Sequence, residues 1–117
     1  METYAIVRPE HLNHVGTLFG GQLLKWVDEY AWIAATRDYP DCLFATRAMD
    51  RVAFDRSVQI GAILRFHVEK ERCGRTSATY AVSVTARYPG SAEEIPVFTT
   101  SITFVNMSRN GGKREIH

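Results

Sequence analysis

Residues 13–37 (NHVGTLFGGQLLKWVDEYAWIAATR) contain the residue types and spacing most suited to chemistry. Asn13 precedes a glycine pair, Gly20 and Gly21, and Asp28 follows two helical turns later. Glycine at the start of a helix leaves the first amides uncovered, and these amides together with the helix dipole favour a partial negative charge. The stretch therefore combines a candidate anion-stabilising turn with a candidate functional carboxylate.

Residues 20–37 are predicted to form one long helix, which a turn at 38–41 ends. At about 100° per residue, Asp28 falls at the edge of a continuous apolar arc, whereas Glu29 faces water. The arc consists of Leu23, Leu24, Val27, Ala31, Ala34 and Ala35. A partly buried carboxylate is costly unless it is hydrogen-bonded or functional. On helix geometry alone, pairing of Asp28 with Lys25 or simple solvation stays open as the alternative.

The composition excludes several classes of function. The chain has 117 residues, is 45% hydrophobic and has a formal net charge of +1, which gives no general attraction to nucleic acid or to a membrane surface. Cys42 and Cys73 show no pairing pattern, and no segment is typical of a signal peptide or a membrane span, so we expect a cytoplasmic protein. His11 and His14 have a metal-like spacing, but no matching third ligand follows, so we expect no metal.

Apart from the helix, the chain reads as strands joined by turns. Alternating apolar residues and turn signals predict strands at 3–8, 43–54, 62–72, 76–88 and 95–107. Short turns imply antiparallel neighbours, and one helix is best covered by a sheet that wraps it. The expected fold is α+β, a single domain over residues 1–117 with a flexible tail at about 108–117.

A second apolar patch on the predicted helix consists of Trp26, Tyr30 and Ile33, and it points away from the first arc. Because one sheet cannot cover both sides of a helix, we expect a partner subunit, most simply an identical one in a two-fold dimer. Long loops of the same chain are the alternative cover.

The run N13-x-x-G-T-L-F-G-G-Q-L-L-K-W-x-D28 resembles the helix motif of the hotdog-fold acyl-CoA thioesterases, and in particular the cytosolic acyl-CoA hydrolase group with its small bacterial relatives. Later segments agree in order: T-R-A at 46–48, the turn V-x-x-G at 58–61 and G-R-T-S at 74–77. The resemblance extends to about residue 105. It implies a hotdog fold, in which an antiparallel sheet wraps one central helix, and hydrolysis of acyl-CoA to a carboxylic acid and coenzyme A.

The resemblance also implies roles for single residues. Asp28 would be the catalytic carboxylate, as general base or as nucleophile, and Asn13 of the other subunit would orient water or substrate. The amide of Gly21 would bind the thioester oxygen. The positions that would line the coenzyme A arm are Thr46, Arg47, Ala48, Arg75, Thr76 and Ser77. Neither a metal nor a separate cofactor is implied, because coenzyme A is part of the substrate.

Two rival functions remain on the same fold. One is a non-catalytic acyl-CoA sensor or binding module, which would not need a base. The other is a hotdog dehydratase or hydratase acting on acyl carrier protein. That chemistry usually needs a histidine with a carboxylate across the dimer, and His14 is the only candidate in the loop. The physical argument favours hydrolysis because a helix-start amide is aimed at the charge that builds on a thioester oxygen.

Overall fold

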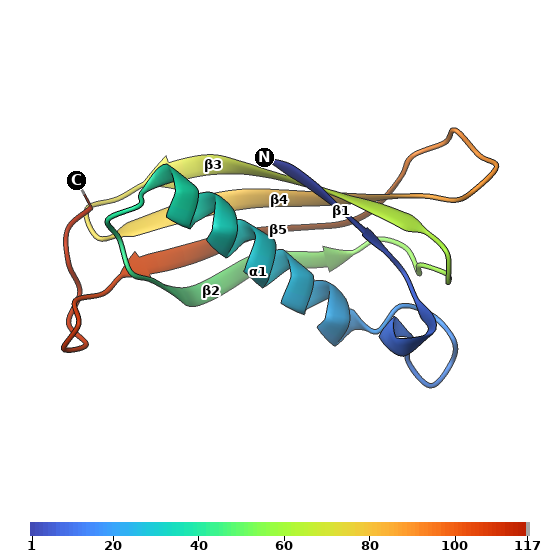
Figure 1. Ribbon diagram of the computed structural model, residues 1–117, viewed down its shortest axis with the longest axis horizontal. Helices are drawn as coiled ribbons and strands as arrows, with labels where there is room; N and C mark the ends of the chain where they lie inside the picture. Colours follow the sequence, from blue (N-terminus) through green and yellow to red (C-terminus); the bar gives the residue numbers. More distant parts are fainter. Residues whose placement is uncertain (117) are drawn as a thin grey trace.

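The computed structural model describes residues 1–116, which form a five-stranded sheet and one long helix (Figure 1). The elements are β1 (Glu2–Ile6), the 3-10 helix η1 (Pro9–His11), α1 (Gly20–Asp38), β2 (Phe44–Phe54), β3 (Ile63–Cys73), β4 (Ser77–Arg87) and β5 (Ile95–Asn106). The helix and all five strands lie where the sequence predicted them, to within two residues at each end. No helix within these residues has the length and apolarity that a membrane span requires.

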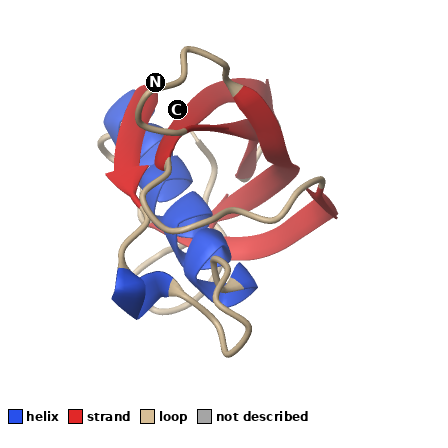
Figure 2. Cartoon of the chain, turned by 90° about the vertical axis from the view of Figure 1, so that its right-hand side faces the viewer, coloured by secondary structure: helices blue, strands red, loops and turns tan. Residues whose placement is uncertain are grey.

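The strands form one sheet in the order β1-β3-β4-β5-β2, and every neighbouring pair is antiparallel. Viewed from the end, the sheet curves around α1 so that the helix lies in its concave side (Figure 2). The predicted α+β fold with a sheet wrapped around a central helix is therefore confirmed. Its two edge strands, β1 and β2, lie at the two sides of the helix (Figure 1).

The apolar arc of α1 forms the helix side of the core, as its periodicity predicted. Leu23, Val27 and three alanines of the arc are buried, whereas Leu24 is half-buried. Alanine at three positions lets the helix axis approach the sheet closely, and large side chains of the strands fill the space around it. These buried strand residues include Leu64, Phe66, Tyr80, Phe98, Ile102 and Phe104.

The second apolar patch was predicted to need a partner subunit, and this prediction is wrong for Trp26 and Tyr30. Trp26 is buried, with its ring centroid 6.0 Å from that of Phe66 and 4.7 Å from that of His11. Tyr30 is half-buried, with its ring centroid 4.9 Å from that of Phe66. The sheet curvature brings β3 to this side of α1, and η1 supplies His11, so the chain covers most of the patch itself.

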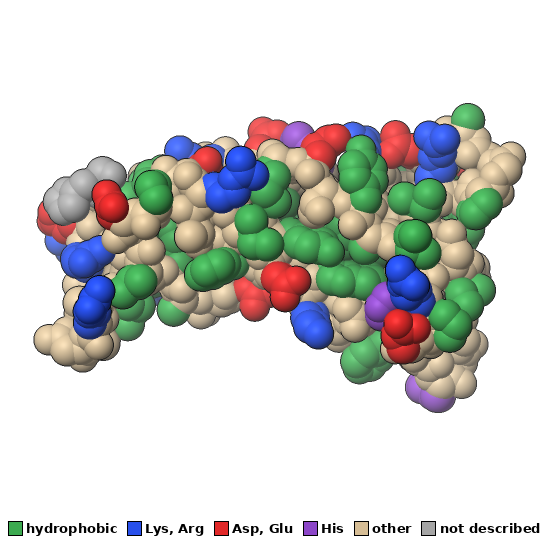
Figure 3. Space-filling model, in the orientation of Figure 1, with side chains coloured by type: hydrophobic (Ala, Val, Ile, Leu, Met, Phe, Trp, Pro, Cys, Tyr) green, Lys and Arg blue, Asp and Glu red, His purple; other side chains and the backbone are tan. Residues whose placement is uncertain are grey.

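Apolar side chains nevertheless stay exposed on the face that carries α1 and β1, where hydrophobic side chains gather along the middle of the molecule (Figure 3). On the helix, Trp32 is 41% exposed and Ile33 is 36% exposed. On β1, Tyr4 and Ile6 are exposed as well. Of the predicted patch, Ile33 therefore stays exposed, and Trp32 joins it in the surface available to a partner.

The segment after β5 was predicted to be a flexible tail, but its described part returns to the fold. The amide of Arg114 donates to the carbonyl of Asn106 at 2.8 Å, and the amide of Ile116 donates to the carbonyl of Arg75 at 2.9 Å. The fully buried Asn106 joins this segment to β2, because its Nδ2 donates to the Glu115 carbonyl and its Oδ1 accepts from the Leu43 amide. Residue 117, the last of the predicted tail, lies outside the described residues.

The C-terminal end of α1 is tied to the sheet by one side-chain hydrogen bond. The hydroxyl of buried Tyr80 donates to Oδ2 of Asp38 at 2.5 Å, and burial raises the pKa of Tyr80, so the phenol keeps its proton. Tyr80→Phe keeps the ring and removes the donor. We expect a loss of about 1 kcal/mol in the free energy of unfolding, measured by urea denaturation.

The matched control is Tyr4→Phe, because Tyr4 is 59% exposed and shows no side-chain hydrogen bond within residues 1–116. This variant should unfold at the wild-type urea concentration. Equal midpoints for wild type and Tyr80→Phe would contradict the role assigned to the Tyr80–Asp38 bond.

Candidate active site

Asp28 lies where α1 faces the edge strand β2. Its side chain is half-buried, and the hydroxyl of Thr46 on β2 donates to its Oδ1 at 2.6 Å. Within residues 1–116 Asp28 forms no ion pair, so the predicted alternative of pairing with Lys25 does not occur in this structure. The carboxylate keeps Oδ2 without a side-chain or backbone donor in the described chain, and this oxygen is available to water or to a ligand.

The position of Thr46 follows from the pairing of β2. Thr46 pairs with Phe104 of β5, and the register shifts between Thr46 and Ala48, which leaves Arg47 as the extra residue of a bulge. Thr46 was predicted to line the coenzyme A arm, whereas the structure places its hydroxyl on Asp28. A threonine on a strand gives no sequence signal for a partner 18 residues away on a helix, so this contact could not be predicted.

The glycine pair begins α1 and leaves its amides free. The carbonyl of Phe19 accepts hydrogen bonds from Gln22 and Leu23, while the amides of Gly20 and Gly21 donate to no acceptor in residues 1–116. A Cβ on Gly21 would lie 2.6 Å from Cε2 of Phe19, so a side chain at residue 21 would displace the exposed Phe19 ring from this turn. Phe19 provides no side-chain cap, and the Gly21 amide therefore remains available to an outside acceptor.

Asn13 shapes the loop that leads into the helix. Its Oδ1 accepts from the amides of Val15 (3.0 Å) and Thr17 (3.1 Å), and its Nδ2 donates to Oγ1 of Thr17 at 3.1 Å. Gly16 closes this loop with φ of 87°. Asn13 precedes the start of α1, whereas Asp28 lies more than two turns inside the helix, and the described chain contains no hydrogen bond between the two side chains.

The remaining predicted positions meet at one end of the sheet. Ser77 of β4 and Ala45 of β2 both pair with Val105 of the intervening strand β5. The 46–48 and 75–77 segments are therefore about 10 Å apart, two strand spacings. The side chains of Arg47 and Arg75 are exposed, which leaves both guanidinium groups accessible to anions, although Nη1 of Arg75 pairs with Oε1 of Glu115 at 3.1 Å.

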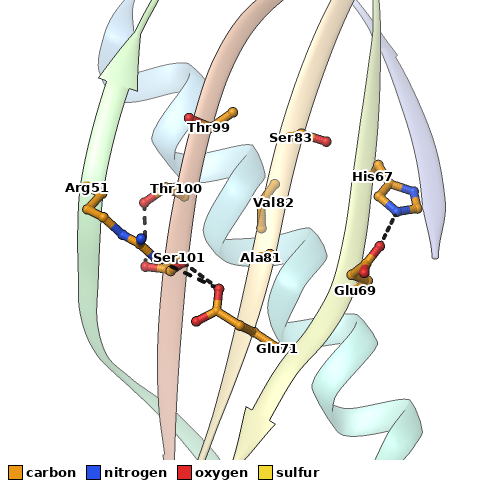
Figure 4. Close-up of a pocket in the computed structure, with 10 residues that line it drawn as sticks. All are labelled: Arg51, His67, Glu69, Glu71, Ala81, Val82, Ser83, Thr99, Thr100 and Ser101. Carbon is orange, nitrogen blue, oxygen red and sulfur yellow. Dashed lines mark hydrogen bonds and ion pairs between the residues drawn. The ribbon is translucent and has the colours of Figure 1, made fainter.

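A separate cavity of about 400 Å³ lies on the outer face of the sheet, opposite α1, and its lining residues are drawn in Figure 4. Its charged groups are satisfied by one another: Arg51 donates to the hydroxyl of Ser101 at 3.1 Å, and Ser101 donates to Glu71 at 2.9 Å. Nε2 of His67 lies 2.8 Å from a carboxylate oxygen of Glu69. None of the predicted site residues lines this cavity, so it is not part of the candidate site.

In residues 1–116 no cluster of histidine, cysteine and acidic side chains has a metal-binding arrangement.

Comparison with known families agrees with this geometry. The family described as the thioesterase superfamily matches residues 15–92, which include the glycine pair, Asp28, Thr46 and the 75–77 segment. The chain belongs to this superfamily.

Relatives of known sequence support the same assignment. The mouse acyl-coenzyme A thioesterase 11 is 32% identical over 100 residues, which are 86% of this chain and 17% of the mouse protein. A mouse acetyl-coenzyme A thioesterase is 28% identical over 95% of this chain and 19% of its own length. The chain thus spans less than a fifth of the length of these mouse relatives.

Solved structures place the fold in the same group. A hexameric hotdog-fold thioesterase of Campylobacter jejuni is 31% identical with a TM-score of 0.87, covering 98% of this chain and 88% of that one. An acyl-CoA hydrolase of Staphylococcus aureus, solved with butyryl coenzyme A and coenzyme A, has a TM-score of 0.90 at 24% identity, over 99% of this chain and 70% of that one. The chain adopts the hotdog fold.

Proposed function

We propose that this protein hydrolyses acyl-CoA thioesters, with Asp28 as its catalytic carboxylate. The observation that carries the proposal is the half-buried Asp28 held by Thr46 at 2.6 Å, on the same side of α1 as the free amide of Gly21. The two residues lie within 20° of each other around the helix axis, at about 100° per residue. The names of the mouse relatives and the coenzyme A complex of the Staphylococcus aureus relative support an acyl-CoA substrate.

The reaction balances with groups that the chain supplies. Asp28 accepts a proton from water as the water oxygen attacks the thioester carbon, and a backbone amide of Gly21 stabilises the oxyanion that forms. When the carbon–sulfur bond breaks, the proton passes to the coenzyme A sulfur, and the products are a carboxylic acid and free coenzyme A. One such amide donor is typically worth about 10²–10³ in rate. Direct attack by Asp28 through an anhydride gives the same products.

A single chain does not bring the two groups close enough. Seven residues of helix separate Gly21 from Asp28 by about 10 Å, whereas a base must lie within about 3 Å of the proton that it removes. We therefore propose a two-fold dimer in which Asp28 of one protomer faces the Gly21 amide and the Asn13 loop of its partner. The open edge of β2 and the exposed side chains of Val52 and Trp32 support this contact. The Campylobacter jejuni relative is a hexamer, which is compatible with further assembly of such dimers.

The two rival functions find less support in this geometry. A sensor would not need a carboxylate positioned by a threonine beside a free helix amide. A dehydratase would need a histidine paired with a carboxylate. The ring of His11 packs against Trp26, and His14 forms no hydrogen bond or ion pair with a carboxylate in residues 1–116. Cys42 and Cys73, both free thiols, support a cytoplasmic protein.

The first test replaces the carboxylate. Asp28→Asn keeps the shape and the hydrogen bond from Thr46 but removes the base, so turnover of acyl-CoA should fall by about 10²–10⁴ at unchanged stability. Thiol release from acyl-CoAs of increasing chain length measures this loss. Turnover that persists in Asp28→Asn would place the base elsewhere. In the wild type, a single turnover in ¹⁸O-water would distinguish the two roles of Asp28, because only a nucleophile would incorporate ¹⁸O into its own carboxylate.

The second test separates positioning from binding at Thr46. Thr46→Val keeps the shape of the side chain and removes the donor to Asp28. We expect kcat to fall on the order of 10- to 100-fold with KM for acyl-CoA unchanged, because the loss misplaces the carboxylate. A raised KM with normal kcat would instead make Thr46 a binding residue of the coenzyme A arm.

The third test asks whether the site is shared between subunits. Asn13→Ala and Asp28→Asn chains are each expected to be nearly inactive, but a mixed dimer would contain one site with both residues intact. Refolding the two variants together at equal amounts should therefore restore about a quarter of the wild-type activity. Absence of recovery, or an active protein that sediments as a monomer, would contradict the shared site.

A further inference from the structure

A cavity of about 410 Å³ opens at the N-terminal end of α1, between the helix and the 54–58 segment that follows β2. Its lining includes Leu18, Leu23, Phe54, Ser57 and Val58, together with the backbone of Gly20. The floor is apolar and buried, since Leu18 is 9% exposed and both Leu23 and Val58 are 3% exposed. The amide of Leu18 donates to the carbonyl of Val58 at 2.8 Å, which holds the two sides of the floor together.

The wall of this cavity is the ring of Phe54, the last residue of β2. Phe54 packs against buried Phe98 with ring centroids 5.0 Å apart, yet it is 52% exposed. A Cβ on Gly20 would lie 3.6 Å from Cε1 and Cζ of Phe54. This is an ordinary van der Waals distance, so alanine would fit at position 20, whereas a longer side chain would extend into the cavity beside the ring.

The cavity adjoins the amide that the proposed reaction uses. Gly20, which borders the cavity, is the residue before Gly21, whose free amide is proposed to bind the thioester oxygen. A carbonyl held there has its acyl side within reach of an apolar floor. The polar groups at the rim, on Asp55, Arg56 and Ser57, are all exposed to water.

We propose that this cavity holds the apolar tail of the acyl group and that Phe54 and Gly20 set the chain length it accepts. The inference rests on the proposed function, and it names the substrate feature that the site selects, the length of the aliphatic chain. Each methylene buried against the floor raises kcat/KM by about fourfold until the chain meets Phe54. Beyond that length the gain per methylene disappears.

The other apolar cavity is less suited to this role. It has a volume of about 580 Å³ and is lined by Tyr4, Ile6, Trp26, Tyr30 and Ile63, among others. Its helix residues, Trp26 and Tyr30, lie five and nine residues after Gly21, about 8 and 13 Å along the helix axis. The first cavity is bordered by Gly20, the residue next to Gly21. A chain in the second cavity would therefore begin farther from the Gly21 amide.

The experiment measures kcat/KM for saturated acyl-CoAs from two to sixteen carbons with two variants of the wall. Phe54→Ala should extend the rise in kcat/KM by several carbons, and Gly20→Val should end it earlier, each with a change of about tenfold or more at the affected lengths. Ile6→Ala, which truncates an exposed side chain in the second cavity, is the matched control and should keep the wild-type profile.

The same chain-length series is measured as Kd by calorimetry on Asp28→Asn, alone and combined with Phe54→Ala or Gly20→Val. If the wild type hydrolyses nothing but its Kd series still shifts with the wall variants, the proposed reaction fails and the assignment of the cavity stands. If hydrolysis occurs and both wall variants keep the wild-type profile, the assignment is overturned. It is overturned equally if Ile6→Ala shifts the profile, or if Phe54→Ala changes only the sedimentation of the protein, which would make Phe54 an interface residue.

Discussion

The structure depends on the way one curved sheet holds one helix. The concave side of five antiparallel strands encloses the arc of Leu23, Val27 and the alanines, so burial of this arc fixes the rotation of α1 about its axis. The same sheet ends at β2 and leaves the adjoining side of the helix open. Asp28 lies at that border because its position around the helix axis is at the edge of the buried arc. The packing of the arc against the sheet therefore determines how deeply the carboxylate is buried.

Most of the fold could be predicted from the sequence because its signals are local. The helix period placed Asp28 between core and solvent, and alternation placed the strands, since both patterns require only neighbouring residues. The cover of Trp26 could not be predicted, because it depends on how far β3 bends and on His11 of η1. The return of the C-terminal segment was missed for a similar reason, since a polar, glycine-rich sequence gives no sign of a buried partner such as Asn106.

The candidate site could be predicted only in part. Asp28 and the glycine pair stand out by type and spacing, and the structure brings Asp28 together with Thr46, a residue that the resemblance had assigned to the coenzyme A arm. The two adjacent glycines lie against different aromatic rings: Gly21 against the ring of Phe19, and Gly20 against the ring of Phe54. Sequence shows two glycines side by side, but which ring each one meets depends on long-range packing.

The two side-chain hydrogen bonds of Asn106, which join the start of the β2 region to the C-terminal segment, affect local unfolding. Its side chain bonds to Leu43, just before β2, and to Glu115, while Ile116 bonds to Arg75 in the turn between β3 and β4. Detachment of the last residues would therefore leave Nδ2 of the buried Asn106 without its acceptor and free the Arg75 carbonyl at the same time. The amides of Arg114 and Ile116, which both bond to the fold from this segment, should share a single opening free energy.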